Sequence, residues 1–146
     1  MARYIVDSQI DNHEKYYFIR EQESQDIVLL PSKYLMHKKR SKLSPNTIRR
    51  SAGAISYYLN YIDETGIQLD DVWEMPYNKQ QEHFTDYLIW LQAGLHSGDS
   101  YKKKPYNETC NAYLKEVFRF YRFSGQRDES TKQLKVLSDM RIIVHN

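Results

Sequence analysis

The sequence predicts a mainly α-helical domain, a bundle of four to five helices with a short β-hairpin or strand segment at its N-terminus. Two observations lead to this prediction. Apolar residues recur at helical spacing in segments bounded by Pro and Gly, and the first 30 residues contain short β-branched and aromatic runs. With 146 residues, 40% of them hydrophobic and 14% aromatic, the chain can form one hydrophobic core but not two large domains. We therefore expect a strand-like arm over residues 1–30 and a helical domain over residues 31–140.

The arm contains three short β-branched and aromatic runs, at residues 4–6, 16–19 and 27–30, which polar turns separate. We expect two or three short strands here. An isolated hairpin is only marginally stable in water, so we expect the arm to pack against the helices. A short basic helix is predicted for residues 31–41, because Pro31 favours the first turn of a helix.

The clearest helix signal spans residues 44–65. Ser44 is a good N-cap, Pro45 suits the first helical position, and Gly66 favours the end of the helix. One apolar stripe is expected to be buried, and it consists of Ile48, Ala52, Ile55, Leu59 and Ile62. The opposite face is expected to carry Asn46, Arg50, Gly53 and Tyr57, with Arg49 on its flank.

Three further helices are predicted, over residues 78–95, 106–124 and 130–140, and residues 142–144 are expected to be extended. The first of these helices carries a wide apolar face of Phe84, Tyr87, Leu88, Trp90 and Leu91. In the second, the residues expected to face inward are Cys110, Leu114, Val117, Phe118 and Tyr121, whereas Glu108, Ala112, Lys115 and Arg119 should face outward.

Composition excludes several classes of function. The longest apolar runs are far shorter than the roughly 20 residues of a membrane span, and no secretory leader is found near the N-terminus, so we expect a cytoplasmic protein without a membrane partner. The single cysteine, Cys110, excludes an internal disulfide and is expected to be a buried thiol. The five histidines lack metal-site spacing, and the five glycines form no phosphate loop. We therefore expect no metal, no cofactor and no small-molecule substrate.

The charges are strongly segregated along the chain, although the net charge is only +2. Residues 27–62 contain no Asp or Glu but seven Lys and Arg, whereas residues 63–77 contain only acidic charges. A second basic cluster begins with three consecutive lysines at residues 102–104 and continues through residues 115–122. Two basic patches separated by an acidic connector favour a polyanionic partner.

Two segments with a common pattern carry a family resemblance. The first reads Ser44-x-x-Thr47, followed by Ile55, Tyr58 and Tyr61-Ile62. The second reads Thr109-Cys-Asn-Ala-Tyr-Leu114, followed by Phe118, Phe120-Tyr121 and Phe123. This pair, over about residues 30–125, resembles the core-binding, SAM-like domain of tyrosine-type site-specific recombinases and phage integrases. That family has Ser-x-x-Thr in the first segment and Thr-x-Asn-Arg-x-Leu in the second.

The resemblance implies a helical domain that forms half of a clamp around double-stranded DNA at a recombination half-site, in DNA integration or recombination. It also implies that catalysis belongs to a separate C-terminal domain, so that this chain is not itself an enzyme and residues 141–146 begin a linker. The isolated chain is then expected to be a monomer, and the full-length protein an oligomer on DNA. The physical argument agrees, because helix N-termini and basic side chains both attract phosphate.

By matching positions, the resemblance implies DNA contacts from Ser44, Asn46, Thr47, Arg49 and Arg50 in the first segment and from Thr109 and Asn111 in the second. Charge placement adds Lys38, Lys39, Arg40, Lys42, Lys102, Lys103, Lys104, Lys115 and Arg119. Ala112 replaces the arginine that the family pattern contains after Asn111, so that contact is either lost or supplied by Lys115 or Arg119.

Each of these features also has a structural interpretation. Ser44 and Thr47 can cap a helix without any DNA, and basic residues on a helix face are often only solvated. The aromatic residues fall on the apolar stripes and are interpreted as core rather than as platforms for bases, namely Tyr57, Tyr58, Tyr61, Trp90, Phe118 and Tyr121.

His37-x-x-Arg40 matches a pattern of the recombinase active site but precedes the segments that resemble the core-binding domain, so we assign no catalytic residue. The alternative function is a helical protein-interaction module that does not bind nucleic acid. A small enzyme of another type is the third hypothesis, which no combination of nucleophile, base and stabilising group supports.

Overall fold

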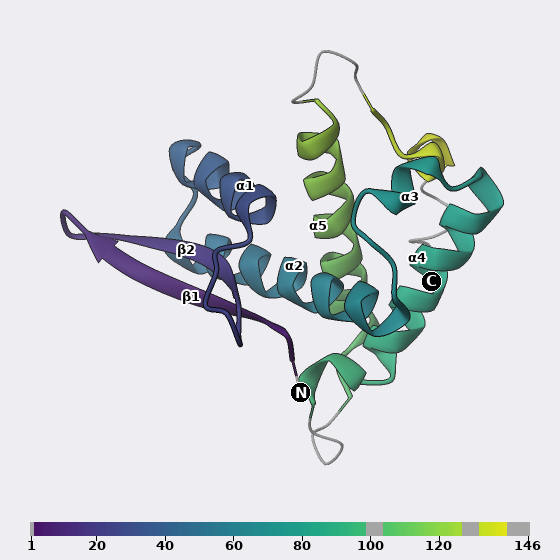
Figure 1. Cartoon of the computed structure of the whole chain (residues 1–146), viewed down its shortest axis with the longest axis horizontal. Helices are drawn as coiled ribbons and strands as arrows, with labels where there is room; N and C mark the ends of the chain where they lie inside the picture. The colour runs from purple at the N-terminus through teal and green to yellow at the C-terminus, as the bar shows by residue number, and fades with distance from the viewer. Residues whose placement is uncertain (1, 99–103, 127–131, 140–146) are drawn as a thin grey trace.

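The computed structural model describes residues 2–98, 104–126 and 132–139, and Figure 1 shows their arrangement. This part of the chain contains five α-helices and one two-stranded antiparallel sheet, which confirms the predicted fold class. In chain order the elements are β1 (Tyr4–Asp11), β2 (Glu14–Glu21), α1 (Leu29–Arg40), α2 (Pro45–Thr65), α3 (Asp71–Glu74), α4 (Tyr77–Gln92), η1 (Leu95–Ser97), α5 (Asn107–Gly125) and η2 (Lys135–Asp139). The long helix α2 contacts the hairpin, α1 and α5, and so connects the arm to the bundle.

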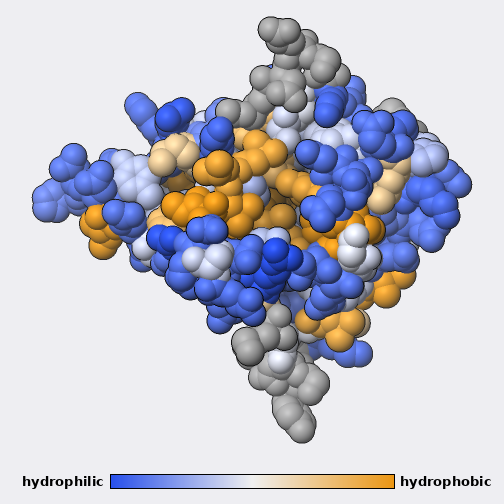
Figure 2. All heavy atoms as spheres, in the orientation of Figure 1, coloured by the Kyte–Doolittle hydropathy of each residue, from blue (hydrophilic) through white to orange (hydrophobic). Residues whose placement is uncertain are grey.

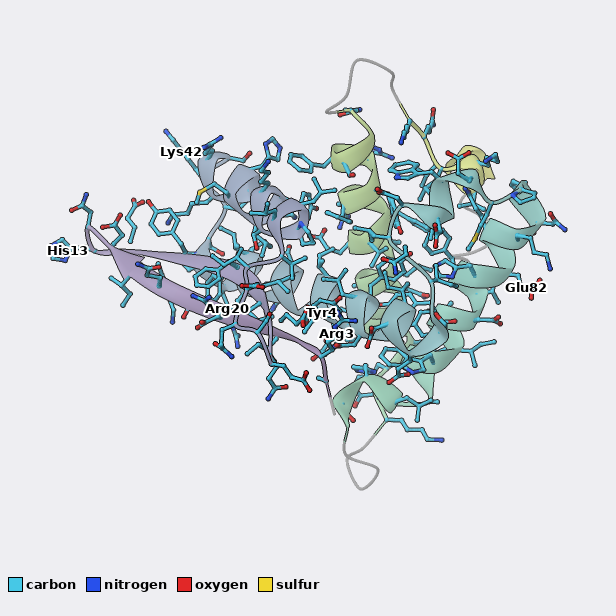
Figure 3. The ribbon with its side chains drawn as sticks, viewed as in Figure 1. Arg3, Tyr4, His13, Arg20, Lys42 and Glu82 are labelled. Carbon is cyan, nitrogen blue, oxygen red and sulfur yellow. The ribbon has the colours of Figure 1, made fainter. Side chains whose placement is uncertain are left out.

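The N-terminal strands form a regular hairpin that docks on α2, as expected. Pairing runs from Tyr4 opposite Glu21 to Asp11 opposite Glu14. At the open end of the hairpin, the side chain of Asn60 on α2 accepts a hydrogen bond from the backbone N–H of Tyr4 (2.9 Å) and donates one to its carbonyl (3.2 Å). Figure 3 shows Tyr4 beside α2 and the hairpin tip at the opposite end.

Of the two or three strands expected in the arm, two form, and residues 27–30 do not make a third. Only Ile27 pairs with the hairpin, in an isolated bridge to Arg20. The next backbone N–H, of Val28, still donates to the carbonyl of Ile19 (2.8 Å), but α1 begins one residue later. The N–H of Ile19 is then satisfied by the hydroxyl of Ser32, within α1 (3.1 Å), so a side chain replaces the expected strand pairing.

Helix α2 has the boundaries and the buried face that the sequence predicts. The hydroxyl of Ser44 accepts a hydrogen bond from the backbone N–H of Thr47 (3.2 Å), and Gly66 ends the helix with a φ of 75°, a conformation that suits glycine. All five residues of the predicted apolar stripe are buried.

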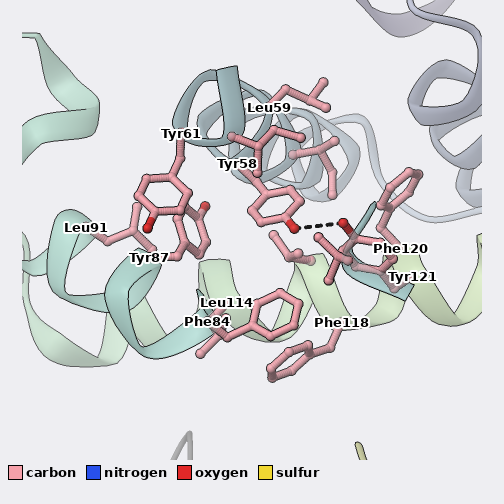
Figure 4. Close-up of a cluster of buried hydrophobic side chains, with 14 of the residues drawn as sticks. Tyr58, Leu59, Tyr61, Phe84, Tyr87, Leu91, Leu114, Phe118, Phe120 and Tyr121 are labelled. Carbon is pink, nitrogen blue, oxygen red and sulfur yellow. Dashed lines mark hydrogen bonds between the residues drawn. The ribbon is translucent and has the colours of Figure 1, made fainter. Parts of the chain in front are cut away.

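The centre of the core lies between α2, α4 and α5 and is rich in aromatic residues (Figure 4). The predicted inward residues of α4 and α5 are all buried, including the thiol of Cys110. A chain of hydrogen bonds crosses this core. The hydroxyl of Tyr121 donates to the carbonyl of Leu69 (3.0 Å) and lies 2.7 Å from the hydroxyl of Tyr58, which in turn lies 2.9 Å from Nε2 of His83.

Two elements differ from the sequence prediction. The short helix α3 was not predicted, and it places Val72 and Trp73 in the core. The predicted helix over residues 130–140 is a 3-10 helix, η2, in its described part. The extended segment at residues 142–144 and the linker at residues 141–146 lie outside the described residues.

Candidate nucleic-acid interface

Helices α1, α2 and α5 enclose an open groove of about 620 Å³, which we call the interhelix groove. Its walls contain predicted DNA-contact residues from three segments that are distant in the sequence. The lining residues are Lys38 of α1, Thr47, Arg50, Ser51 and Ala54 of α2, and Glu108, Thr109, Ala112, Tyr113, Glu116 and Arg119 of α5. The first-turn residue Thr47 of α2 and the first-turn residue Thr109 of α5 therefore face one shared space.

A buried carboxylate lies in the wall of this groove. Glu116 is 5% exposed, and its oxygens contact Nζ of Lys38 (2.8 Å), the guanidinium of Arg119 (3.3 Å) and the hydroxyl of Tyr34 (3.1 Å). Burial raises the pKa of the Glu116 carboxyl, but hydrogen bonds from Lys38 and Ser51 outweigh burial and leave the pKa below its ordinary value. Glu116 is therefore ionised at neutral pH and neutralises part of the predicted positive charge.

The two basic residues that contact Glu116 differ in how far their side chains are exposed to solvent. The side chain of Lys38 is only 14% exposed, and its ammonium group is paired with Glu116, so it has little contact with solvent. That of Arg119 is 60% exposed and keeps donors available to solvent. Of the two, Arg119 is the one that can contact a ligand in the groove.

A second open space, the α1–α5 groove of about 490 Å³, adjoins the first and shares Lys38 and Arg119 with it. It adds Arg122, which was not among the predicted site residues. The signal was present, because Arg122 follows Arg119 by three residues and so lies on the same face of a helix. In the described part of the chain, neither Arg122 nor Arg50 pairs with a carboxylate within 4.0 Å.

Three predicted residues of the α1 end lie on another face. Lys39 pairs with Glu14 of the hairpin (3.7 Å) and lies over the ring of Tyr16 (5.3 Å). Arg40 and Lys42 line a groove of about 860 Å³ between α1 and the hairpin, the hairpin groove. Figure 3 shows Lys42 at the outer end of α1.

The remaining predicted residues have varied surroundings. Ser44 is occupied as the cap of α2, and Oδ1 of Asn46 accepts hydrogen bonds from the guanidinium of Arg49 (2.7 Å for Nη2). Oδ1 of Asn111 is buried and has no hydrogen-bond partner among the described residues. Lys104 and Lys115 are exposed, whereas Lys102 and Lys103 lie outside the described residues.

The His37-x-x-Arg40 motif does not form a site. The imidazole of His37 packs on the ring of Phe123 (5.0 Å between centroids) and lines the α1–α5 groove, whereas Arg40 lines the hairpin groove. The two side chains thus enter different grooves and do not meet.

No protein-family model, curated protein or solved structure matches the chain. Within the described ranges, no helix has the length and apolar character needed to cross a membrane. No group of three or more His, Cys, Asp or Glu residues in the same ranges is placed to hold a metal ion.

Proposed function

We propose that the chain binds double-stranded DNA through the interhelix groove and the adjoining α1–α5 groove. The observation that carries this proposal is that α2 and α5 bring Thr47, Arg50, Thr109 and Arg119 to the walls of one open groove. The resemblance implies contacts from Thr47, Arg50 and Thr109, charge placement adds Arg119, and these residues come from two segments about sixty residues apart in the sequence. A role as the core-binding half of a tyrosine recombinase clamp rests on the resemblance of the same two segments.

Binding in this proposal is mainly to phosphate. Arg50, Arg119 and Arg122 present guanidinium groups that suit bidentate contacts with phosphate oxygens, and the hydroxyls of Thr47 and Thr109 add shorter contacts. Such contacts position a protein on the duplex but carry little sequence information. The chain has no catalytic role in this proposal and would hold DNA for a separate active site.

The test is the affinity for a short fluorescent duplex as a function of salt concentration. The logarithm of the binding constant should fall steeply with the logarithm of salt, by about 0.9 per phosphate contact. The double variant Arg49→Ala/Arg50→Ala should bind all sequences more weakly and lower this slope by about 1 to 2. Both side chains are exposed and contact no carboxylate among the described residues, so the fold should be retained.

A matched control removes the same charge elsewhere. Lys15 on the hairpin and Lys79 on α4 are exposed and do not line the interhelix groove or the α1–α5 groove. The variant Lys15→Ala/Lys79→Ala should keep the affinity and the slope of the unmodified protein. Absence of salt-dependent binding, or equal losses in both double variants, would contradict the proposal.

A second candidate function, a protein-interaction module, is favoured by one observation. Figure 2 shows apolar side chains gathered near the centre of one face, within a hydrophilic surround. Ile27, between the hairpin and α1, is 45% exposed, and Leu29, the first residue of α1, is 67% exposed. Large exposed apolar groups can mark a protein contact. If this is the function, the duplex should not bind even at low salt, and Leu29→Lys should abolish capture of a partner.

A further inference from the structure

A small surface pocket beside Gly53 has features that the duplex-binding proposal does not use. Its volume is about 260 Å³, and it is lined by Val6 of β1, Arg49, Arg50, Gly53 and Tyr57 of α2, and Tyr113 of α5. We call it the Gly53 pocket. It adjoins the interhelix groove and shares Arg50 and Tyr113 with it.

The absent side chain at residue 53 contributes to the hollow. A Cβ atom at Gly53 would meet nothing within 4 Å, so the space above this turn of α2 is open. Glycine costs about 0.5–1 kcal/mol relative to alanine inside a helix. At residue 53 the helix therefore has a residue that destabilises it and that leaves open space at the surface.

The charges of the pocket select an anion. Its lining contains two guanidinium groups and no carboxylate. The guanidinium of Arg49 is oriented by Oδ1 of Asn46, which contacts both Nε (3.3 Å) and Nη2 (2.7 Å). Neither guanidinium has a carboxylate partner among the described residues, and such groups suit a phosphate group.

The other end of the pocket is aromatic and held in place. The ring of Tyr57 packs edge-on against Tyr113 (5.3 Å between centroids) and against His96 (4.7 Å). Unlike its neighbours Tyr58 and Tyr61, Tyr57 is only partly buried, so its interpretation as a core residue holds in part. Aromatic side chains fixed in this way provide stacking surfaces for nucleobases, which all have a π face.

The dimensions suit one nucleobase in the pocket with its phosphate beside the arginines. From Arg50 to Tyr57 the helix rises by about 10 Å, which is comparable to the reach of a nucleotide from its phosphate to the far edge of its base. The volume of 260 Å³ lies below the range of about 300–1,000 Å³ that encloses a drug-sized molecule, so a single ring system fits rather than a whole ligand.

We propose that the Gly53 pocket receives one unpaired nucleobase of bound DNA, stacked on the ring of Tyr57 with its edge toward Tyr113, while Arg49 and Arg50 hold the adjacent phosphate. This inference rests on the proposed DNA binding and adds a preference for duplexes in which one base is already out of the stack. A base that is already extruded costs least to unstack, so more of the free energy of its contact with the pocket contributes to affinity.

The test compares a fully paired duplex with the same duplex carrying one extruded 2-aminopurine, at equal salt. The unmodified protein should bind the second duplex more tightly, by a factor of about 5 to 150, which is the contribution of one stacked base. The fluorescence of the 2-aminopurine should fall on binding, because stacking on a tyrosine quenches it.

The variant Gly53→Met fills the pocket without removing any contact, and Gly53→Ala is its matched control. Both substitutions favour the helix, so both should keep the fold, as circular dichroism and thermal unfolding will show. Gly53→Met should bring the ratio of the two affinities close to one and leave the paired duplex bound as before. Gly53→Ala, which adds one methyl group, should retain the preference.

The possible failures are distinguishable. Lack of binding to either duplex overturns the proposed function and this inference with it. Equal binding of both duplexes by the unmodified protein overturns the inference alone, and an unchanged preference in Gly53→Met shows that the extruded base binds elsewhere.

Discussion

The buried imidazole of His83 makes the stability of the protein depend on pH. His83 is 6% exposed, and burial lowers its pKa from 6.5 to about 4. The hydrogen-bond chain of the core fixes its proton. The hydroxyl of Tyr121 donates its hydrogen bond to the carbonyl of Leu69, so the hydroxyl of Tyr58 must donate to the oxygen of Tyr121. The oxygen of Tyr58 is then left to accept a hydrogen bond from Nε2–H of His83. The folded protein therefore holds a neutral imidazole with the proton on Nε2.

The sign and size of the effect follow from the two pKa values. Between pH 6.5 and about 4 the unfolded chain protonates His83 whereas the folded protein does not, so acidification favours the unfolded state. The contribution of His83 is fully present above pH 6.5 and is lost as the pH falls to about 4. A shift of this size corresponds to about 3 kcal/mol, at about 1.4 kcal/mol per pH unit.

Urea unfolding at several pH values measures this loss. The variant His83→Gln is the matched control, because its amide N–H can still donate to Tyr58 but does not titrate. Below pH 6.5 the unmodified protein should lose free energy of unfolding steadily relative to His83→Gln, by up to about 3 kcal/mol. Subtraction removes the contributions of His96 and of the carboxylates, which titrate in both proteins. Parallel pH profiles for the two proteins would refute the reasoning.

Three further predictions concern single contacts. Ser44→Ala should lower the free energy of unfolding by about 1 kcal/mol in urea titrations, because the cap of α2 is lost, and Ser44→Asp should restore it. Tyr87→Phe should raise the melting temperature, because the hydroxyl of Tyr87 is buried without a hydrogen-bond partner among the described residues. Tyr121→Phe should instead lower the melting temperature, because it removes two hydrogen bonds. Equal effects of the two substitutions would contradict this reasoning. Glu116→Gln should tighten DNA binding, because Lys38 and Arg119 lose their anionic partner. The slope of the logarithm of the binding constant against the logarithm of salt should steepen by about the amount of one phosphate contact. The variant should also unfold at a lower temperature.

Local signals in the sequence were sufficient for the long helices. The apolar stripe, Ser44 and Gly66 defined α2 to within a residue, because periodicity and capping act over a few turns. The four-residue helix α3 could not be predicted in this way. It depends on distant contacts, since Trp73 packs on Tyr121 (5.1 Å) and the carbonyl of Val72 accepts a hydrogen bond from Gln80 (2.7 Å).

The candidate interface was predictable in part. The outward faces of α2 and α5 follow from helical spacing, but the packing that joins them into one groove does not. Nor does the sequence reveal that Glu116 takes the charge of Lys38, because this pair brings together α1 and α5 from opposite halves of the chain. Charge clusters along a sequence therefore overstate the charge that a surface offers.

Ion pairs within the protein determine which basic side chains remain available to contact DNA. At the end of α1, Lys38 and Lys39 are held by carboxylates, and Arg40 faces the hairpin groove. The basic side chains that line the two proposed DNA-binding grooves and remain accessible are therefore arginines, above all Arg50 and Arg122. A guanidinium presents a planar fork of donors that matches phosphate, whereas an ammonium is a point charge. An Arg50→Lys exchange should then keep the charge but weaken DNA binding, which a simple count of positive charges would not anticipate.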